Sequence, residues 1–326
     1  MLRNAKQCLV VSHVNPDGDA VGASLAWWSY LRAAYPELEA RVAFPNRCPE
    51  FLGWIEGANQ VMIYADNKEA AQSYLKGCDL VFCLDFNALN RLEGMCEALT
   101  GHSAPRVLID HHRQPADEFA LVFSDITMSS TSEFIYRIVL ALGGKTLLSR
   151  GAAEALYVGL ITDTGSFSFS VSTPEPFRMA ADLMELGVDK DTIASRVYDS
   201  FSEKRMRLLG YCLNTKMRVF PKYKAAYVAL SRSELDEFGF QVGDTEGFVN
   251  FPLSIKKVSL SALLMEASDK TYIRVSLRSK GNILSVNELA RKYFNGGGHF
   301  NASGGKFFGS LKDCEAYFEK ILKDEF

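Results

Sequence analysis

Three potential metal ligands crowd one short segment near the start of the chain. The segment HVNPDGD carries His13, Asp17 and Asp19, and it follows the apolar run Cys8–Ser12. The run predicts a buried strand and the residues from Asp19 onward predict a helix, so the three side chains would gather at a strand's carboxyl end. Imidazole and carboxylate ligands together suit a divalent transition metal. Because aspartate also caps helices well, this segment alone leaves a metal site and a helix cap equally open.

Three further apolar segments end in an acidic residue or a histidine. DLVFCLD ends in Asp85, RVLIDHH ends in Asp110, His111 and His112, and YVGLITD ends in Asp163. One such ending is ordinary loop chemistry. Four segments that all end this way indicate a shared pocket, because active sites collect titratable residues from several elements.

A pair of divalent cations explains why one pocket would need so many carboxylates. Two cations about 3.5–4 Å apart repel strongly, so several anionic ligands must surround them. One carboxylate and one hydroxide usually bridge such a pair, and the hydroxide is the nucleophile because metal binding lowers the pKa of water. The mixed His and Asp set favours Mn²⁺ over an all-oxygen Mg²⁺ or Ca²⁺ site. We therefore expect two Mn²⁺ ions, with Mg²⁺ or Co²⁺ as substitutes.

A glycine-rich segment near the end of the chain, GGGHFNASGG, suggests a phosphate-binding loop. Gly297 and Gly298 would let the backbone approach a ligand closely, and exposed amides can bind an anion. His299 lies in the same segment, and Arg278 ends the predicted strand upstream of it. A flexible turn is the alternative for the glycines alone, but the nearby histidine and arginine favour phosphate binding.

The elements that must position these residues fall into two parts. In the first half, short apolar runs alternate with helical patterns, which is typical of an α/β fold with a mostly parallel sheet flanked by helices. Ligands of such sheets bind beyond the carboxyl ends of the strands. We expect residues 1–188 to form this metal-binding domain, residues 189–222 a helical linker, and residues 223–326 a smaller α+β substrate-binding domain. The expected strands are 8–12, 41–44, 61–64, 79–84, 106–109, 225–230, 259–266 and 272–277, and the main expected helices are 19–35, 132–142, 152–162, 286–293 and 311–322.

Composition narrows the classes of protein and partner. The 326 residues carry a formal net charge of −3, which argues against tracking long nucleic acid by charge but permits a small nucleotide or short RNA substrate. The seven cysteines form no CxxC pair, so a zinc knuckle or disulfide scaffold is not expected. Without a signal peptide pattern or a membrane span, the sequence predicts a cytoplasmic protein with no membrane partner. It leaves the oligomeric state open, a homodimer included.

Taken together, these segments resemble the DHH/DHHA1 phosphoesterase family. That family includes RecJ-like exonucleases and bacterial oligoribonucleases that also act as phosphatases on 3′-phosphoadenosine 5′-phosphate. The matching stretches occur in the family's order over nearly the whole chain: SHVNPDGDAVGAS, LDFN, IDHH, ITDTGSF, LRSKG and GGGHFNASGG. The chain has Ala23 where the usual family motif has serine, at a position that is not an expected ligand.

The resemblance implies a role for each site residue. His112 would contact the scissile phosphate or its leaving oxygen, and Asp110 would orient a histidine. Arg278 and His299, with Gly297 and Gly298, would hold a substrate phosphate. The implied ligands are His13, Asp17 and Asp85 for the first Mn²⁺, and Asp19, Asp85, His111 and Asp163 for the second, with Asp85 bridging.

The leading hypothesis is Mn²⁺-dependent hydrolysis of short oligoribonucleotides, of 3′-phosphoadenosine 5′-phosphate, or of both, by a metal-bridged hydroxide. A phosphodiesterase for cyclic dinucleotides or pApA and a single-strand exonuclease remain alternatives, although RecJ-type enzymes carry additional nucleic-acid-binding domains. The glycine-rich segment speaks against a family II inorganic pyrophosphatase. A non-catalytic nucleotide-binding regulatory module would be expected to lack one or more metal ligands, yet every expected position is filled.

Overall fold

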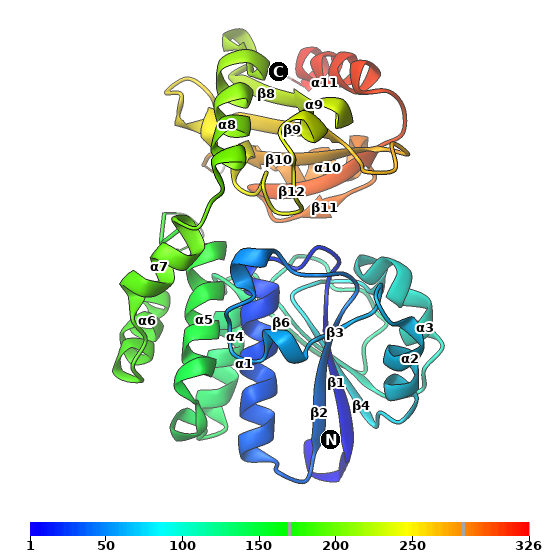
Figure 1. Ribbon diagram of the computed structural model, residues 1–326, viewed down its shortest axis with the longest axis vertical. Coiled ribbons are helices and arrows are strands. Elements are labelled where there is room, and N and C mark those ends of the chain that lie inside the picture. Colours follow the sequence, from blue (N-terminus) through cyan, green and yellow to red (C-terminus); the bar gives the residue numbers. More distant parts are fainter. Residues whose placement is uncertain (169–170, 282–283, 326) are drawn as a thin grey trace. The chain divides into compact units, whose positions relative to one another are not determined.

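The chain forms two compact units. The computed structural model describes residues 1–168, 171–281 and 284–325, and it divides into Met1–Ser200 and Phe201–Phe326 (Figure 1). The first unit holds the expected parallel sheet and the second a mixed sheet, so the predicted α/β fold class is confirmed. Among the described residues, no helix is both long and apolar enough to cross a membrane.

The first unit is built on a six-stranded sheet in which every neighbouring pair is parallel. The strand order is β3-β2-β1-β4-β5-β6. The chain therefore moves outward in one direction from β1 and then returns to the centre to move outward in the other. In such sheets the ligand crevice lies where the direction reverses, which here is between the carboxyl ends of β1 and β4. The strands are β1 (Gln7–Ser12), β2 (Glu39–Phe44), β3 (Met62–Ile63), β4 (Leu80–Leu84), β5 (Arg106–Asp110) and β6 (Leu121–Ser124).

Helices cover both faces of this sheet. Alternate residues of β1 enter different cores: Cys8 and Val10 pack on one face, and Leu9 and Val11 on the other. A strand buried on both faces reads as a continuous apolar run, which is why Cys8–Val11 (CLVV) is apolar throughout. The first core includes α1 (Gly18–Ala34), α4 (Thr131–Ala141), α5 (Arg150–Asp163), α6 (Glu175–Glu185) and α7 (Lys190–Tyr198), and the second includes α2 (Lys68–Lys76), the 3₁₀ segment Leu89–Met95 and α3 (Cys96–Thr100).

Glycines allow α1 and α5 to pack at very short distance. A Cβ atom at Gly22 would lie 2.3 Å from the carbonyl oxygen of Ala155, and one at Gly18 would lie 2.4 Å from Oγ1 of Thr162. Because Gly18 begins α1 and Thr162 is almost the last residue of α5, the two helices run in opposite directions. The close packing therefore brings the start of α1, with its aspartates, next to the end of α5.

The second unit is a six-stranded mixed sheet of order β11-β12-β10-β9-β8-β7. Only β8 and β9 run parallel to each other; the other pairs are antiparallel. One face packs on α10 and α11, while α8 and α9 pack on the other, over β8 and β9. The elements are α8 (Glu203–Tyr211), β7 (Arg218–Phe220), β8 (Ala225–Leu230), α9 (Arg232–Glu237), β9 (Leu260–Glu266), β10 (Ile273–Ser279), α10 (Val286–Tyr293), β11 (Gly297–Gly298), β12 (Ala302–Phe307) and α11 (Leu311–Glu325).

The glycine-rich segment is not a loop as expected. Gly297–Gly298 form β11 and Ala302–Phe307 form β12, so only residues 299–301 turn between two paired strands. Glycine has a weak preference for strands, so the sequence alone does not predict β12. The strand forms because β10 pairs with it along its whole length.

Candidate metal centre

Six potential ligands gather at element ends around the carboxyl edge of the parallel sheet. His13 directly follows β1, Asp85 follows β4 and His111 follows β5. Asp17 caps α1 by accepting hydrogen bonds from the amides of the first turn. The remaining two are Asp19, in the first turn of α1, and Asp163, the last residue of α5.

Asp85 lies between two separate groups of ligands. Its Oδ2 is 3.5 Å from Nε2 of His13, and its Oδ1 is 3.6 Å from Nε2 of His111. Asp85 is only 3% exposed, so both oxygens are fixed by their surroundings rather than by solvent. A carboxylate with each oxygen directed at a different imidazole has the arrangement that a bridging ligand requires.

The other aspartates divide between these groups. Oδ2 of Asp17 lies 3.9 Å from Nε2 of His13. Oδ2 of Asp163 lies 3.3 Å, and Oδ2 of Asp19 lies 3.9 Å, from Nε2 of His111. Within each group, His13–Asp17–Asp85 and Asp19–His111–Asp163, one ligand atom per residue falls within 4.8 Å of the others. The structure thus brings all six predicted metal ligands together as two adjoining sets.

Backbone carbonyls orient both histidines. Nδ1 of His13 lies 2.9 Å from the carbonyl oxygen of Val14, and Nδ1 of His111 lies 3.2 Å from that of Met128. A carbonyl oxygen can only accept, so Nδ1 carries the proton in each ring. Nε2 then faces the carboxylates: it donates a proton to them while the ring is charged, and it offers them a lone pair once the ring is neutral, which is the form that a metal ligand needs.

The pKa values of the buried aspartates indicate that this group of ligands needs additional positive charge. Burial and the charges of Asp85 and Asp163 raise the pKa of Asp19 well above its ordinary value, and burial raises the pKa of Asp163 to about 6. Burial opposes ionisation of Asp85 too, but hydrogen bonds from His111 and His13 hold its pKa well below the usual range. Buried carboxylates without enough cations tend to keep their protons. Four carboxylates and two imidazoles therefore suit divalent transition metals in two ways. Their oxygen and nitrogen atoms are ligands that such metals accept, and their negative charge balances that of the cations.

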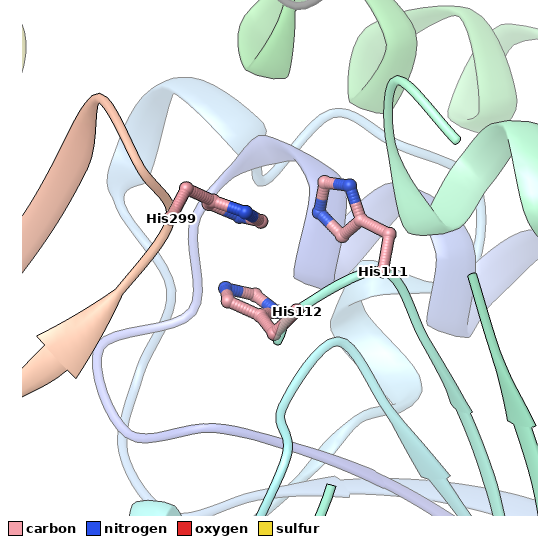
Figure 2. Close-up of side chains that lie close together, drawn as sticks. All are labelled: His111, His112 and His299. Carbon is pink, nitrogen blue, oxygen red and sulfur yellow. The ribbon is translucent and has the colours of Figure 1, made fainter. Parts of the chain in front are cut away.

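Two further residues predicted to belong to the site, His112 and Asp110, adjoin this cluster. Nδ1 of His112 donates to Oδ1 of Asp110 at 2.6 Å, and Asp110 is fully buried. Figure 2 shows His112 beside His111, with the two rings edge to face at 5.1 Å between centroids. Since Asp110 holds Nδ1 as the donor, the geometry of His112 is set by a residue that solvent does not reach.

The start of α4 also contacts these carboxylates, and the sequence did not predict it. The amides of Thr131 and Ser132 donate to Oδ2 and Oδ1 of Asp19 at 2.6 and 2.9 Å. Oγ1 of Thr131 donates to Oδ1 of Asp85 at 2.9 Å. The available signal was the SSTSE pattern, in which Ser130 caps a helix whose free amides suit an anion.

The predicted phosphate-binding residues all lie in the second unit. Arg278 is the penultimate residue of β10, directly opposite Ala302 of β12. His299 lies in the turn between β11 and β12, where its amide donates to the carbonyl oxygen of Ala302 at 2.7 Å. Gly298 has a φ of 143°, and a Cβ there would lie 2.6 Å from that same oxygen, so the turn requires glycine.

Comparisons with known proteins agree with this architecture. Residues 7–160 match the DHH family, N-terminal domain, and residues 221–324 match the DHHA1 domain. A crystal structure of an exopolyphosphatase-related protein from Bacteroides fragilis is 38% identical, with a TM-score of 0.91 over 99% of this chain and 93% of that one.

Two curated relatives are also similar over most of their length. A probable bifunctional oligoribonuclease and PAP phosphatase NrnA from Streptococcus mutans is 29% identical over 96% of this chain and 93% of its own. A bifunctional oligoribonuclease and PAP phosphatase NrnA from Bacillus subtilis is 29% identical over 91% of this chain and 88% of its own. With both domain models matched in order, the chain belongs to the DHH family, and its second unit carries a DHHA1 domain.

Proposed function

We propose that the protein is a two-metal phosphoesterase that hydrolyses short oligoribonucleotides and 3′-phosphoadenosine 5′-phosphate. The observation that carries this proposal is the placement of Asp85, whose two oxygens face the histidines of two separate ligand sets. The names of the relatives from Streptococcus mutans and Bacillus subtilis support the choice of substrates. Family membership itself makes the protein a hydrolase of phosphate esters.

The ligands would divide as the two sets do. When bound, the ions supply charge neutralisation and the activation of water for attack on phosphorus. We propose Mn²⁺ because imidazole and carboxylate occur together in both sets. The first ion would be held by His13, Asp17 and Asp85, and the second by Asp19, Asp85, His111 and Asp163.

The remaining residues would act on the substrate directly. We propose that His112 contacts the scissile phosphate or its leaving oxygen, because its ring adjoins that of His111 and Asp110 fixes its orientation. Arg278 and His299 would bind a second phosphate of the same substrate. A guanidinium group is suited to this because it can donate two parallel hydrogen bonds to phosphate oxygens.

Turnover of a substrate panel tests the proposed function. We expect purified protein with Mn²⁺ to hydrolyse pApA, RNA of two to five nucleotides and 3′-phosphoadenosine 5′-phosphate. Longer RNA, single-stranded DNA and pyrophosphate should be poorer substrates by about tenfold or more in kcat/KM. Chelation should abolish turnover, and added Mn²⁺ should restore it. Hydrolysis that survives chelation would contradict the metal mechanism, and a preference for pyrophosphate would contradict the substrate class.

A further inference from the structure

A buried glutamate outside the ligand sets is joined to the metal centre by a single peptide group. Glu133 lies in the first turn of α4 and is 1% exposed. Its Oε2 accepts hydrogen bonds from the amide and from Oγ of Ser129, each at 2.7 Å. That amide belongs to the peptide bond between Met128 and Ser129, whose carbonyl oxygen lies 3.2 Å from Nδ1 of His111. One rigid, planar unit therefore connects the carboxylate to a proposed metal ligand.

The hydrogen bonds on the two sides of this peptide reinforce each other. The carboxylate of Glu133 accepts from the N–H group and polarises the peptide, so the carbonyl oxygen becomes a better acceptor for Nδ1–H of His111. A peptide plane that is held on both sides cannot rotate without breaking one of these bonds. Because both nitrogens belong to one flat ring, the bond at Nδ1 also determines where Nε2 points. Nε2 is the atom that faces Asp19, Asp85 and Asp163.

The protein pairs this buried carboxylate on every side. Oε1 of Glu133 accepts a hydrogen bond from the guanidinium of Arg137, one turn further along α4, in addition to the two bonds from Ser129 at Oε2. Helix capping alone does not explain the arrangement, because Ser130 already caps α4 through its side chain. In a capping box the glutamate would bind the amide of the cap residue itself. Glu133 binds the amide of the residue before it, which belongs to the peptide that faces the histidine.

The first ligand set has a similar connection with a weaker acceptor. Nδ1 of His13 faces the carbonyl oxygen of the next residue, and the amide of that peptide donates to Oδ1 of Asn46 at 2.6 Å. Asn46 is neutral and only partly buried, whereas Glu133 is charged and buried. Hydrogen bonds to charged groups are the stronger ones. Loss of Glu133 should therefore act on the His111 set and leave the His13 set nearly unchanged.

We propose that Glu133 is a positioning residue of the second metal site, which orients His111 for its ion through the Met128–Ser129 peptide. The proposal rests on the proposed function, because it takes His111 as a ligand, and it deepens that function by a residue that acts only through another. The start of α4 thereby supports the second ligand set twice, since its first amides already hold Asp19. Loss of a group that orients a metal ligand lowers metal affinity by about 10–100-fold.

The test follows the ring signals of both histidines by NMR while Cd²⁺, a diamagnetic probe, is added to the full chain with isotope-labelled histidine. Glu133→Gln keeps the size of the side chain, but its single oxygen can serve only one of Ser129 and Arg137. The Cd²⁺ concentration at half-saturation should rise about tenfold for His111 and by less than about twofold for His13. The Mn²⁺ concentration for half-maximal hydrolysis of pApA should rise by a similar factor, with the rate at saturating Mn²⁺ within about threefold of wild type.

Two control variants separate positioning from stability. Ser129→Ala removes the hydroxyl bond to Glu133 but keeps the amide, and Glu154→Gln breaks another Arg–Glu pair of the same spacing, on α5. Both should leave the ratio of the two half-saturation concentrations as in wild type, whatever they do to the melting temperature. A Glu133→Gln protein with a lower melting temperature and an unchanged ratio would show a structural role only, and would overturn the proposal.

A measurement on wild type decides the matter if Glu133→Gln does not fold. The amide proton of Ser129 should be protected from exchange, and its chemical shift should follow the same Cd²⁺ dependence as the ring of His111. An amide signal that stays constant while His111 binds Cd²⁺ would overturn the proposal. If neither histidine of wild type responds to Cd²⁺, the proposed metal mechanism fails as well, a result that is distinct from an unchanged ratio.

Discussion

Replacing Asp85 with asparagine is expected to lower hydrolysis by about a thousandfold, equivalent to about 4 kcal/mol of activation free energy. The change keeps the size of the side chain and one oxygen but removes the charge shared between His13 and His111. Asparagine is the right substitution because Asp85 has a φ of 64°, a left-handed conformation that asparagine tolerates and alanine disfavours. Metal content measured on the purified variant should fall from two ions per chain to one or none.

The matched control for this variant is Asp117→Asn, which removes an exposed carboxylate from the same unit. It should keep wild-type activity and metal content. Circular dichroism must show that the Asp85 variant is folded, because His13 and His111 lose their shared partner. A folded Asp85→Asn protein with near-normal turnover and two bound ions would contradict the bridging role.

Replacing Gly159 with alanine is expected to damage both the helix packing and the metal site. An ideal Cβ at this position would lie 2.0 Å from Oγ of Ser132 and 2.6 Å from Oδ1 of Asp19. Overpacking of this kind costs about 1–3 kcal/mol, and the better helix propensity of alanine returns at most about 1 kcal/mol. The free energy of unfolding should therefore fall by up to about 3 kcal/mol. Displacement of Asp19 should weaken metal binding by about tenfold.

Gly210 offers a matched control on another helix. It lies in α8, and a Cβ built there would meet no heavy atom within 4 Å. Gly210→Ala should therefore leave metal affinity unchanged and raise stability by up to about 1 kcal/mol. If Gly159→Ala behaves in the same way in denaturation and in metal titration, then the close approach of α1 and α5 does not position Asp19.

Much of the fold follows from patterns that the sequence carries locally. The strands Gln7–Ser12 and Leu80–Leu84 are buried on both faces along most of their length, so each appears as an apolar run followed by a polar residue. The helix caps at Asp17 and Ser149 likewise depend on residues a few positions away. Most of the predicted metal ligands stand at such ends, and the structure places all six within reach of one another.

Other features depend on partners far along the chain. Thr131 and Asp19 are 112 residues apart, so the hydrogen bond between them cannot be read from either local sequence. The strand Ala302–Phe307 forms because β10 is adjacent, and Gly297–Gly298 pairs in turn with Ala302–Phe307, whereas glycine by itself indicates a turn. The edge strand Leu121–Ser124 is not predicted either, since four residues are too few to establish a period.

Two cations are expected to share Asp85 at the carboxyl edge of the parallel sheet. Anomalous diffraction from crystals grown with Mn²⁺ would locate these ions. We predict two anomalous peaks about 3.5–4 Å apart, one beside His13 and one beside His111, with an oxygen of Asp85 at each. A single peak, or none within reach of these side chains, would contradict the two-metal account.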